Sequence, residues 1–206
     1  MSNDCNQTAK RESGDERRAA IARAARAIIV EKGLEGLRTR DIAARVGINI
    51  ATLHYHVPSK EALVALVAQS LKAEFRAQGL ARPREGKSGL ELLRIEFEDA
   101  LETHERAAES LAVMAQLGER ASRDPAIAAI MEPMRTYWHG VIAGYFTKGV
   151  EDGSLRADID PAAAARIYIG MVISWRSSRP DRAQMVATFS EFERAFVARP
   201  THDREA

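Results

Sequence analysis

The chain has 206 residues, of which 46% are apolar, 29% charged and 6% aromatic, and it carries 13 glycines and 7 prolines. This length supports one large or two small domains, and the composition excludes disordered, collagen-like and proline-rich chains. The single cysteine, Cys5, excludes an internal disulfide, so a reducing, cytoplasmic location is expected. The longest strongly apolar run, Ile167 to Trp175, is shorter than the roughly 18 residues of a membrane helix, and we expect neither a membrane span nor a secretory signal.

The net charge is only +1, but it is unevenly distributed. Residues 1–78 hold 13 Lys and Arg against 9 Asp and Glu, a balance of +4, whereas residues 79–206 hold 17 against 20, a balance of −3. A basic N-terminal third favours a polyanionic partner for that part of the chain.

Helical periodicity runs through the sequence, and alternating strand patterns are nearly absent, so we predict an all-α fold. After a flexible arm over residues 1–15, a first helix is expected from about Asp15 to Lys32, where Gly33 ends it. Its apolar residues fall at positions i, i+3, i+4, i+7 and i+8, which places them on one face. They are Ile21, Ala24, Ala25, Ile28 and Ile29.

Three further helices follow closely. Thr39 is the predicted N-cap of a short second helix that ends at Gly47. Asn49 is the predicted cap of a third helix, which Pro58 ends because proline disfavours helical backbone in the residue before it. Ser59 caps a fourth helix.

The glycine-rich segment 79–89 is the clearest break in the chain, and the domain boundary is expected there or one turn earlier, inside the fourth helix. Five more helices are expected beyond it, over about 88–104, 106–120, 125–148, 161–178 and 181–198. The helices expected over 125–148 and 161–178 each begin with Asp-Pro, at Asp124 and Asp160. This pair combines a carboxylate cap with a proline in the first turn.

The second and third helices carry the functional signal. They are joined by Val46-Gly47-Ile48-Asn49, and the glycine permits a sharp turn between two short helices that share a small core; this spacing is typical of a helix-turn-helix. The second helix of such a pair faces base edges, and Thr52, Tyr55 and His56 supply neutral donors and acceptors there.

The segment 36–63, GLRTRDIAARVGINIATLHYHVPSKEAL, resembles the DNA-binding domain of TetR-family transcriptional regulators, and the likeness covers residues 17–78. It departs from the commonest pattern at Ala51, His54 and Val57, where Gly, Tyr and Phe are usual. The resemblance implies a homodimer that binds a palindromic operator on double-stranded DNA and releases it when a small molecule enters the C-terminal domain.

The resemblance also implies which residues contact DNA. Thr39 and Arg40 would touch phosphate or a base edge, and His56 and Lys60 would hold the phosphate backbone. His54 stands where tyrosine is usual, and its ring can still donate a hydrogen bond to DNA. The residues expected on the recognition helix are Ile50, Ala51, Thr52 and Tyr55. The recognition helix carries no Lys or Arg between Ile50 and Val57, so base recognition is expected to depend on neutral groups, thymine methyl contacts and DNA shape.

Two other interpretations concern a pair of histidines, as metal ligands, and the arginines of the first helix, as DNA contacts. His54 and His56 are two residues apart on a helix and therefore point in different directions, so we predict no metal site, and no cofactor either. Arg17, Arg18 and the arginines after them favour a solvated helix face, with a phosphate contact of Arg17 or Arg18 as the alternative.

A ligand site is expected in the C-terminal part, although methionines and aromatic residues at helical spacing are usually core. Carboxylates such as Glu96, Glu98, Asp99 and Glu102 are predicted on charged, solvated helix faces. Phe97 and Leu101 are candidates either for the core or for the lining of this pocket. The predicted ligand-binding residues are His104, Met114, Leu117, Met134, Tyr137, Trp138, Tyr168, Met171 and Trp175.

The last helix has an apolar stripe with spacings of four, three and four residues, next to a helix that is apolar nearly all round. Such a stripe fits either the core of the chain or half of a four-helix interface between two subunits, and we favour the interface. The predicted interface residues are Ile167, Trp175, Met185, Phe189, Phe192 and Phe196.

The predicted organisation is an arm over residues 1–15, a DNA-binding domain over 16–78 with its helix-turn-helix at about 38–57, and a ligand-binding and dimerisation domain over 79–200. No nucleophile elbow, phosphate-binding loop or zinc motif is present, so an enzyme is not expected. The resemblance to TetR-family regulators implies a dimeric repressor released by an apolar or amphipathic ligand. The alternative is a helical ligand-binding or scaffold protein of this fold that has lost DNA binding.

Overall fold

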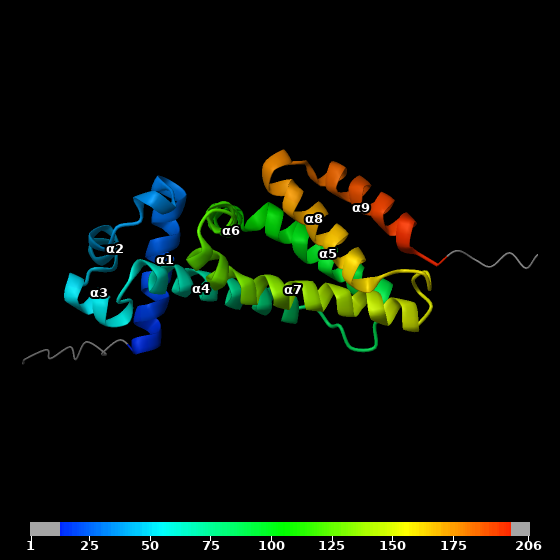
Figure 1. Cartoon of the computed structure of the whole chain (residues 1–206), viewed down its shortest axis with the longest axis horizontal. Helices are drawn as coiled ribbons and strands as arrows, with labels where there is room; N and C mark the ends of the chain where they lie inside the picture. Colours follow the sequence, from blue (N-terminus) through cyan, green and yellow to red (C-terminus); the bar gives the residue numbers. More distant parts are fainter. Residues whose placement is uncertain (1–12, 199–206) are drawn as a thin grey trace, which may run out of the picture. The chain divides into compact units, whose positions relative to one another are not determined.

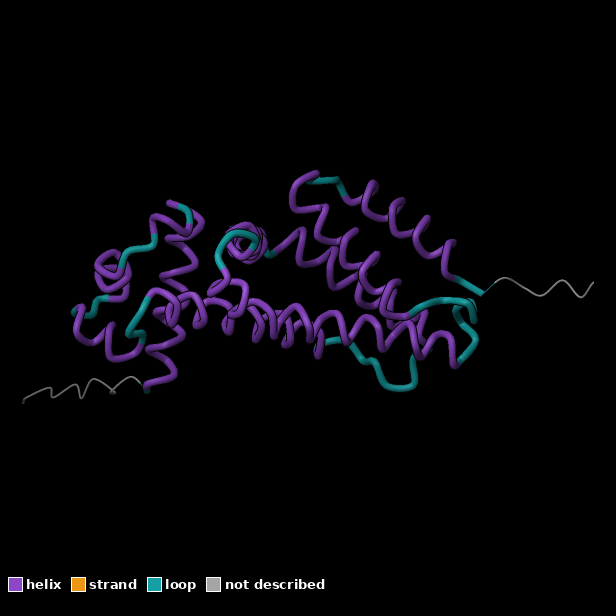
Figure 2. Tube along the Cα trace, viewed as in Figure 1, coloured by secondary structure: helices purple, strands orange, loops and turns teal. Residues whose placement is uncertain are grey.

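A computed structural model describes residues 13–198, and within that range the chain forms nine α-helices and one 3₁₀ turn (Figure 1). Loops join these helices (Figure 2). The one β-bridge of the described residues pairs Leu155 with Val197. The predicted all-α fold is confirmed. The elements are α1 (Gly14–Lys32), η1 (Leu34–Gly36), α2 (Thr39–Val46), α3 (Ile50–His56), α4 (Lys60–Leu80), α5 (Gly89–Arg106), α6 (Ala108–Ala121), α7 (Pro125–Glu151), α8 (Pro161–Ser178) and α9 (Arg182–Phe196).

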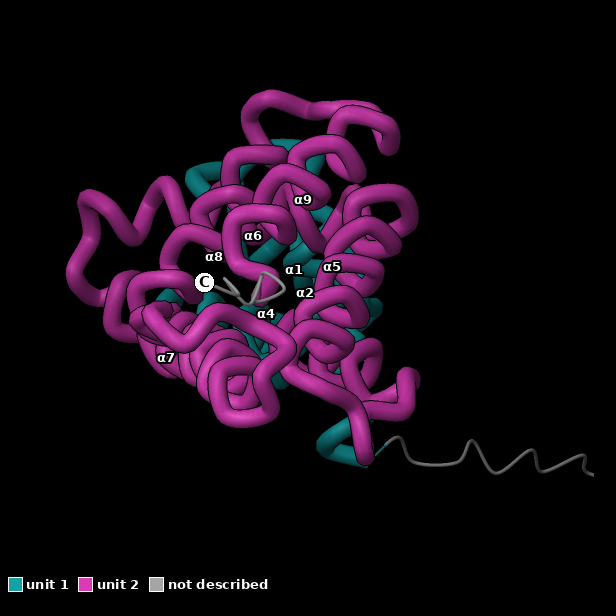
Figure 3. The backbone as a smooth tube through the Cα atoms, turned by 90° about the vertical axis from the view of Figure 1, so that its right-hand side faces the viewer, with its two compact units in different colours: residues 1–70 teal, residues 71–206 magenta. Residues whose placement is uncertain are grey.

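The chain divides into two compact units, residues 1–70 and residues 71–206 (Figure 3). The division falls inside α4, upstream of the predicted boundary at residue 79, so this helix begins in the first unit and ends in the second. Among the described residues no helix is long and apolar enough to cross a membrane.

Helix α1 begins slightly earlier than the sequence predicts. Ser13 accepts a hydrogen bond from the Glu16 amide, and the Glu16 carboxylate accepts one from the Ser13 amide, which together form a capping box. Residues 13–15 are therefore the cap and first turn of α1 and not part of an arm. The rest of the predicted arm, with Cys5, lies outside the described residues. The predicted apolar face of α1 is confirmed, since all five of its residues are buried.

The second unit has its core between α5, α7, α8 and α9. The Asp caps predicted from the two Asp-Pro pairs are present: Asp124 accepts hydrogen bonds at the start of α7, and Asp160 does so at the start of α8. The side chains of α9 that were expected on one stripe point into this core, where the Phe189 ring stacks on Phe97 with centroids 4.0 Å apart.

This packing bears on the predicted subunit interface. Met185 is 1% exposed, Phe189 6%, Phe192 9% and Trp175 4%, so these four side chains belong to the core of their own subunit, which is the alternative that the sequence left open. Phe196 also packs against this core, with its ring 5.3 Å from that of Phe146. The physical reason is that α9 packs its apolar stripe against the apolar surfaces of α5, α7 and α8. Ile167 alone of the predicted set is exposed, at 56%.

The start of α5 lies against the end of α7 and the loop after it. The Gly89 amide donates to Asp152 Oδ2 at 2.8 Å, and the Leu90 amide donates to Ser154 Oγ at 3.2 Å. A Cβ atom added to Gly89 would lie 2.2 Å from the backbone nitrogen of Gly149, so the two helices approach more closely here than any side chain permits.

Replacing Gly89 with alanine should therefore destabilise the protein. We expect Gly89→Ala to lower the free energy of unfolding by about 2 kcal/mol or more, because the clash is with backbone and cannot be relieved by a rotamer change. Gly118→Ala is the matched control: nothing lies within 4 Å of its added Cβ, and alanine in the middle of a helix should add about 1 kcal/mol. Denaturant unfolding of both variants measures this difference, and equal stability of the two would contradict the close approach.

Candidate nucleic-acid interface

The turn between α2 and α3 depends on two residues. Gly47 has φ 75° and ψ 33°, a left-handed conformation that favours glycine, and its amide donates back to α2. Two residues later the Asn49 side chain accepts a hydrogen bond from the Thr52 amide at 2.7 Å and caps α3, as predicted. The predicted cap of α2 is wrong by one residue: Thr39 is the first helical residue, and Arg38 precedes it without a side-chain cap.

The inner side of the helix-turn-helix is closed by apolar side chains. Leu53 is completely buried, Val57 is 2% exposed, and Ile42 of α2 is completely buried. Val46 and Ile48, predicted members of the same core, are half-buried. A seven-residue helix has no stability of its own in water, so these contacts set the orientation of α3.

The opposite side of α3 faces solvent. Tyr55 is 84% exposed and Ile50 is 48% exposed, and Ala51 and His54 are exposed with them. Thr52 and His56 are half-buried on the same helix. Around α3, Arg40 and Lys60 are exposed and Thr39 is half-buried. Every residue predicted to contact DNA is thus at least partly accessible, and their contacts with DNA stay a prediction.

Polar contacts tie α3 and α2 to α1. Arg18 donates from Nη1 to the carbonyl oxygen of His56 at 3.2 Å, at the last residue of α3. The sequence favoured a solvated helix face for this arginine, whereas the structure makes it a tether for α3. Arg45 forms a bidentate pair with Glu31, at 2.9 and 2.7 Å, which holds α2 against α1.

The remaining ionic contacts near α3 are exposed. Lys60 lies 3.7 Å from Glu35 and Lys32 lies 3.0 Å from Asp41, and exposed pairs of this kind contribute little to stability. The amide of Ala62 donates to Ser59 Oγ at 3.1 Å, so the predicted cap at the start of α4 is confirmed. Across residues 13–198 no three His, Cys, Asp or Glu side chains gather in a way that would hold a metal ion.

The residues predicted to bind a ligand are spread over the second unit. Tyr168 and Trp175 are core residues, Leu117 is completely buried, and Trp138 and Met171 pack against the core. Tyr137 is 52% exposed, with Lys72 Nζ 5.4 Å from the centroid of its ring. The other three, His104, Met114 and Met134, are half-buried.

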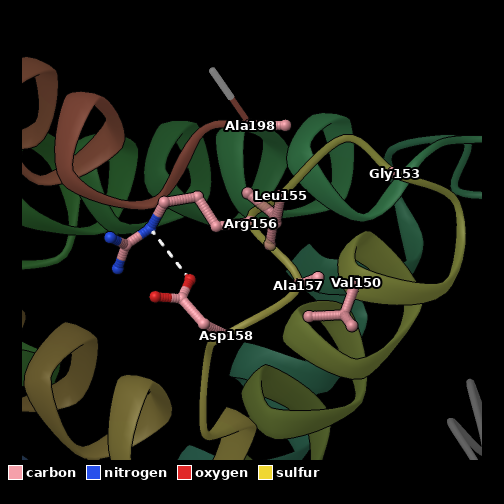
Figure 4. A pocket seen from close by; sticks show the side chains of 7 residues that line it. All are labelled: Val150, Gly153, Leu155, Arg156, Ala157, Asp158 and Ala198. Atoms are coloured by element: carbon pink, nitrogen blue, oxygen red, sulfur yellow. Dashed lines mark ion pairs between the residues drawn. The ribbon is translucent and has the colours of Figure 1, made fainter. Parts of the chain in front are cut away.

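A pocket of about 460 Å³ lies elsewhere in this unit, at the loop after α7 (Figure 4). Arg156 and Asp158 face each other across it, 3.6 Å apart, and small or apolar residues form the rest of its wall. None of the predicted ligand-binding residues lines it. Its walls are Val150, Gly153, Leu155, Arg156, Ala157, Asp158 and Ala198.

Two carboxylates of α5 that were predicted on a solvated face are instead withdrawn from solvent. Asp99 is 7% exposed as a residue, and the Glu96 side chain is 17% exposed. Arg82 and Arg84, from the loop before α5, both pair with Asp99, and Arg84 also pairs with Glu96. The one signal of this burial in the sequence is that the two carboxylates, at positions i and i+3, flank the apolar Phe97. The arginines that neutralise them lie 12 to 17 residues away along the chain.

Burial raises the pKa of both carboxyls. For Glu96, loss of solvation outweighs the Trp138 indole N–H and the Arg84 charge, which lower the pKa. For Asp99, burial likewise outweighs Arg82 and Arg84. Since the folded state then holds these protons more tightly than the unfolded chain, their contribution to stability is greatest at low pH and is lost as the pH rises through the raised pKa.

Comparison with known proteins agrees with this arrangement. Residues 21–67 match the family of bacterial regulatory proteins called the tetR family, and residues 90–195 match the C-terminal domain of BetI-type transcriptional repressors. The HTH-type transcriptional regulator UidR of Escherichia coli K12 is 25% identical over 154 residues, which cover 75% of this chain and 76% of UidR.

Two solved structures share the fold. A transcriptional regulator of Saccharomonospora viridis in complex with choline aligns with a TM-score of 0.78 and 23% identity, over 90% of this chain and all of that one. AibR in complex with isovaleryl coenzyme A and operator DNA aligns with a TM-score of 0.69 and 23% identity, over 84% of this chain and 96% of AibR.

The cap of α3 generates a prediction about the stability of this surface. Asn49→Ala should cost about 1 kcal/mol, because it leaves the Thr52 amide without its acceptor. Amide hydrogen exchange in α3, measured without DNA, should become faster, while Asn49→Ser, which keeps an acceptor, should exchange nearly as the wild type does. Unchanged exchange in Asn49→Ala would show that the packing of Leu53 alone maintains the helix.

Proposed function

The chain belongs to the TetR family of DNA-binding transcriptional regulators, a family that is not enzymatic, and from this premise we propose that it represses transcription as a homodimer on an inverted-repeat operator. The observation that carries the proposal is the two-sided character of α3. Its inner side is fixed by the buried Leu53, and its outer side presents Tyr55 at 84% exposure. In the proposed complex, each subunit inserts α3 into a major groove of the DNA.

The proposed contacts divide into two kinds. Arg40, Lys60 and backbone amides at the start of α4 bind phosphates, together with His54 and His56. Base edges are read by neutral side chains on α3, because that helix carries no Lys or Arg. Thr39, at the start of α2, contacts either a phosphate or a base edge. The base-reading residues are Ile50, Ala51, Thr52 and Tyr55.

Phosphate contacts should supply most of the affinity and make it salt-dependent. Sequence preference should come from Thr52 and Tyr55 and from the shape of the DNA. The protein then acts in the cytoplasm, where its operator is accessible.

The second subunit is proposed to dock on the outer face of α8 and α9. Ile167 and Ile173 on α8 are 56% and 44% exposed, and Val186 on α9 is 41% exposed. Gly170 lies between the two isoleucines with nothing within 4 Å of its Cβ position, which permits close packing of a partner helix. Contiguous patches of large apolar residues are typical of protein interfaces, and we propose that these three side chains form such a patch. This face replaces the core residues that the sequence suggested.

A small organic effector is proposed to bind the second unit and to favour a conformation that does not fit DNA. Such a ligand shifts an equilibrium only through its different affinity for the two states. Support comes from the structures of similar fold, one solved with choline and another with isovaleryl coenzyme A and operator DNA. The alternative, a ligand-binding protein that has lost DNA binding, remains an outcome of the experiment.

The experiment is selection from a pool of random double-stranded DNA, followed by sequencing of the retained molecules. We expect enrichment of an inverted repeat whose half-sites are one helical turn or a multiple of it apart. Weak, salt-insensitive retention without any enriched sequence would favour the ligand-binding alternative.

Two variants separate the two kinds of contact. Lys60→Ala should weaken binding to all duplexes and reduce the slope of log affinity against log salt by about 1, since one phosphate contact is lost. Lys87→Ala, which removes the same charge from the second unit, is the control and should change neither. Thr52→Ala should instead change the preference among operator variants. The assignments are wrong if Lys60→Ala alters the preference or if Thr52→Ala weakens all duplexes equally; fluorescence anisotropy measures both.

The proposed interface has its own test. Ile167→Glu should convert dimers to monomers in light scattering, because a carboxylate would be buried against an apolar partner face. Val30→Glu changes an exposed apolar residue of α1 in the same way and should leave the dimer intact. A dimer that survives Ile167→Glu would place the interface elsewhere.

A further inference from the structure

One guanidinium of the second unit is held in a site built like a receptor for a cation. Arg84, in the loop between α4 and α5, donates from Nη1 to the Tyr145 hydroxyl at 3.0 Å and to Glu96 Oε2 at 3.4 Å, and from Nη2 to Asp99. Its side chain is 21% exposed, so the site is open to solvent on one side.

Aromatic side chains complete the walls of this site. The Arg84 guanidinium lies 5.8 Å from the centroid of the Tyr145 ring, within the range of a cation–π contact. The Trp138 indole donates to Glu96 Oε1 at 3.0 Å and so orients that carboxylate. A carboxylate pair with aromatic neighbours is suited to an organic cation.

A second, independent observation points to a missing polar partner. The Tyr168 hydroxyl is completely buried, and the described residues offer it no hydrogen bond. Tyr168 belongs to the core cluster against which Trp138 and Tyr145, two walls of this site, are packed. Burial, followed by the charges of Glu96 and Asp99, raises the pKa of its hydroxyl. Buried hydroxyls in folded proteins are nearly always hydrogen-bonded, so an unbonded one beside this site requires explanation.

We propose that Arg84 is a built-in substitute for the effector: it occupies a site for a hydrogen-bonding organic monocation, of the guanidine or primary amine type, which displaces it on binding. The charge of the site agrees with a monocation. With Arg84 withdrawn, Asp99 keeps Arg82, which it shares with Glu102, and Glu96 loses the one ion pair that the described residues give it. A second polar group on the ligand would satisfy Tyr168.

The displacement has a mechanical consequence at the end of α4. Arg84 donates from Nε to the carbonyl oxygen of Gly79 at 2.9 Å, in the last turn of that helix. The neighbouring Gln78 donates to the Asp99 carbonyl oxygen at 2.9 Å and accepts from Thr103 at 2.8 Å. A ligand that replaces Arg84 therefore removes one of the contacts that fix the end of α4, a helix that begins in the DNA-binding unit. The regulatory meaning of this step rests on the proposed function, but the binding itself does not.

The test uses methylguanidinium as the probe and no DNA. Arg84→Ala should melt at a lower temperature than the wild type, and millimolar methylguanidinium should raise its melting temperature by several degrees, because the probe refills the site. Calorimetric titration should give an affinity for Arg84→Ala at least about tenfold higher than for the wild type, in which the probe must displace Arg84. Tetramethylammonium, which has no donor for the carboxylates, should not rescue.

Two controls make the result specific. Arg94→Ala removes an exposed guanidinium that pairs with Glu193, and methylguanidinium should not rescue it. Adding Glu96→Gln to Arg84→Ala should abolish the rescue. The proposal is overturned if Arg84→Ala folds but is not rescued, or if Arg94→Ala is rescued equally.

A measurement on the wild type covers the case in which Arg84→Ala fails to fold. Saturating methylguanidinium should accelerate amide hydrogen exchange in residues 79–88, since displaced Arg84 no longer holds that segment, and unchanged exchange would overturn the proposal. Because none of these measurements involves DNA, their failure would leave the proposed DNA-binding function untouched, and failure of operator binding would leave this site untouched.

Discussion

The DNA-binding surface depends on the burial of one leucine. α3 has only seven residues, too few to be stable alone, and Leu53 fixes it to the core of the first unit with no exposure to solvent. The Gly47 turn and the Asn49 cap determine where the helix begins, and the tether from Arg18 reaches its last residue. Because the inner side of α3 is fixed in this way, Tyr55 and the other residues on the opposite side of the helix face solvent. The surface proposed to meet DNA is thus a consequence of packing on the other side of the helix.

The second unit faces a different constraint, because it buries carboxylates together with aromatic rings. Helix α9 closes the core with Met185, Phe189 and Phe192, while Glu96 and Asp99 lie at its margin on α5. Burying charge is costly unless it is paired, and the two arginines of the loop before α5 provide the pairing. The unit therefore owes its stability partly to a loop segment that also contacts the end of α4. That connection gives the proposed effector a physical route to the first unit.

The sequence predicted features whose causes are local. The Gly47 turn, the Asn49 cap and the Asp160 cap each depend on a few consecutive residues, and the structure contains all three. Thr39 was misplaced by one position, because a cap is defined by backbone angles as well as by residue type, and Arg38 has the extended conformation there. A sequence predicts the end of a helix to within one residue at best.

Features that depend on distant residues were not predictable. The stripe on α9 indicates that one face is buried but not what covers it, and the structure shows that α5, α7 and α8 of the same chain do so. Glu96 and Asp99 resemble ordinary charged positions on a helix, and their burial becomes favourable only through Arg82 and Arg84 in the preceding loop. A pattern along one helix contains no information about such partners.

We propose that neutral side chains on α3 read DNA sequence while the cations around that helix supply affinity. The most direct measurement is the ratio of affinities for a selected operator and a scrambled duplex of equal length, followed between about 50 and 200 mM salt. We predict that both affinities fall steeply while their ratio stays high and nearly constant. A ratio near one at every salt concentration would contradict sequence recognition by this helix.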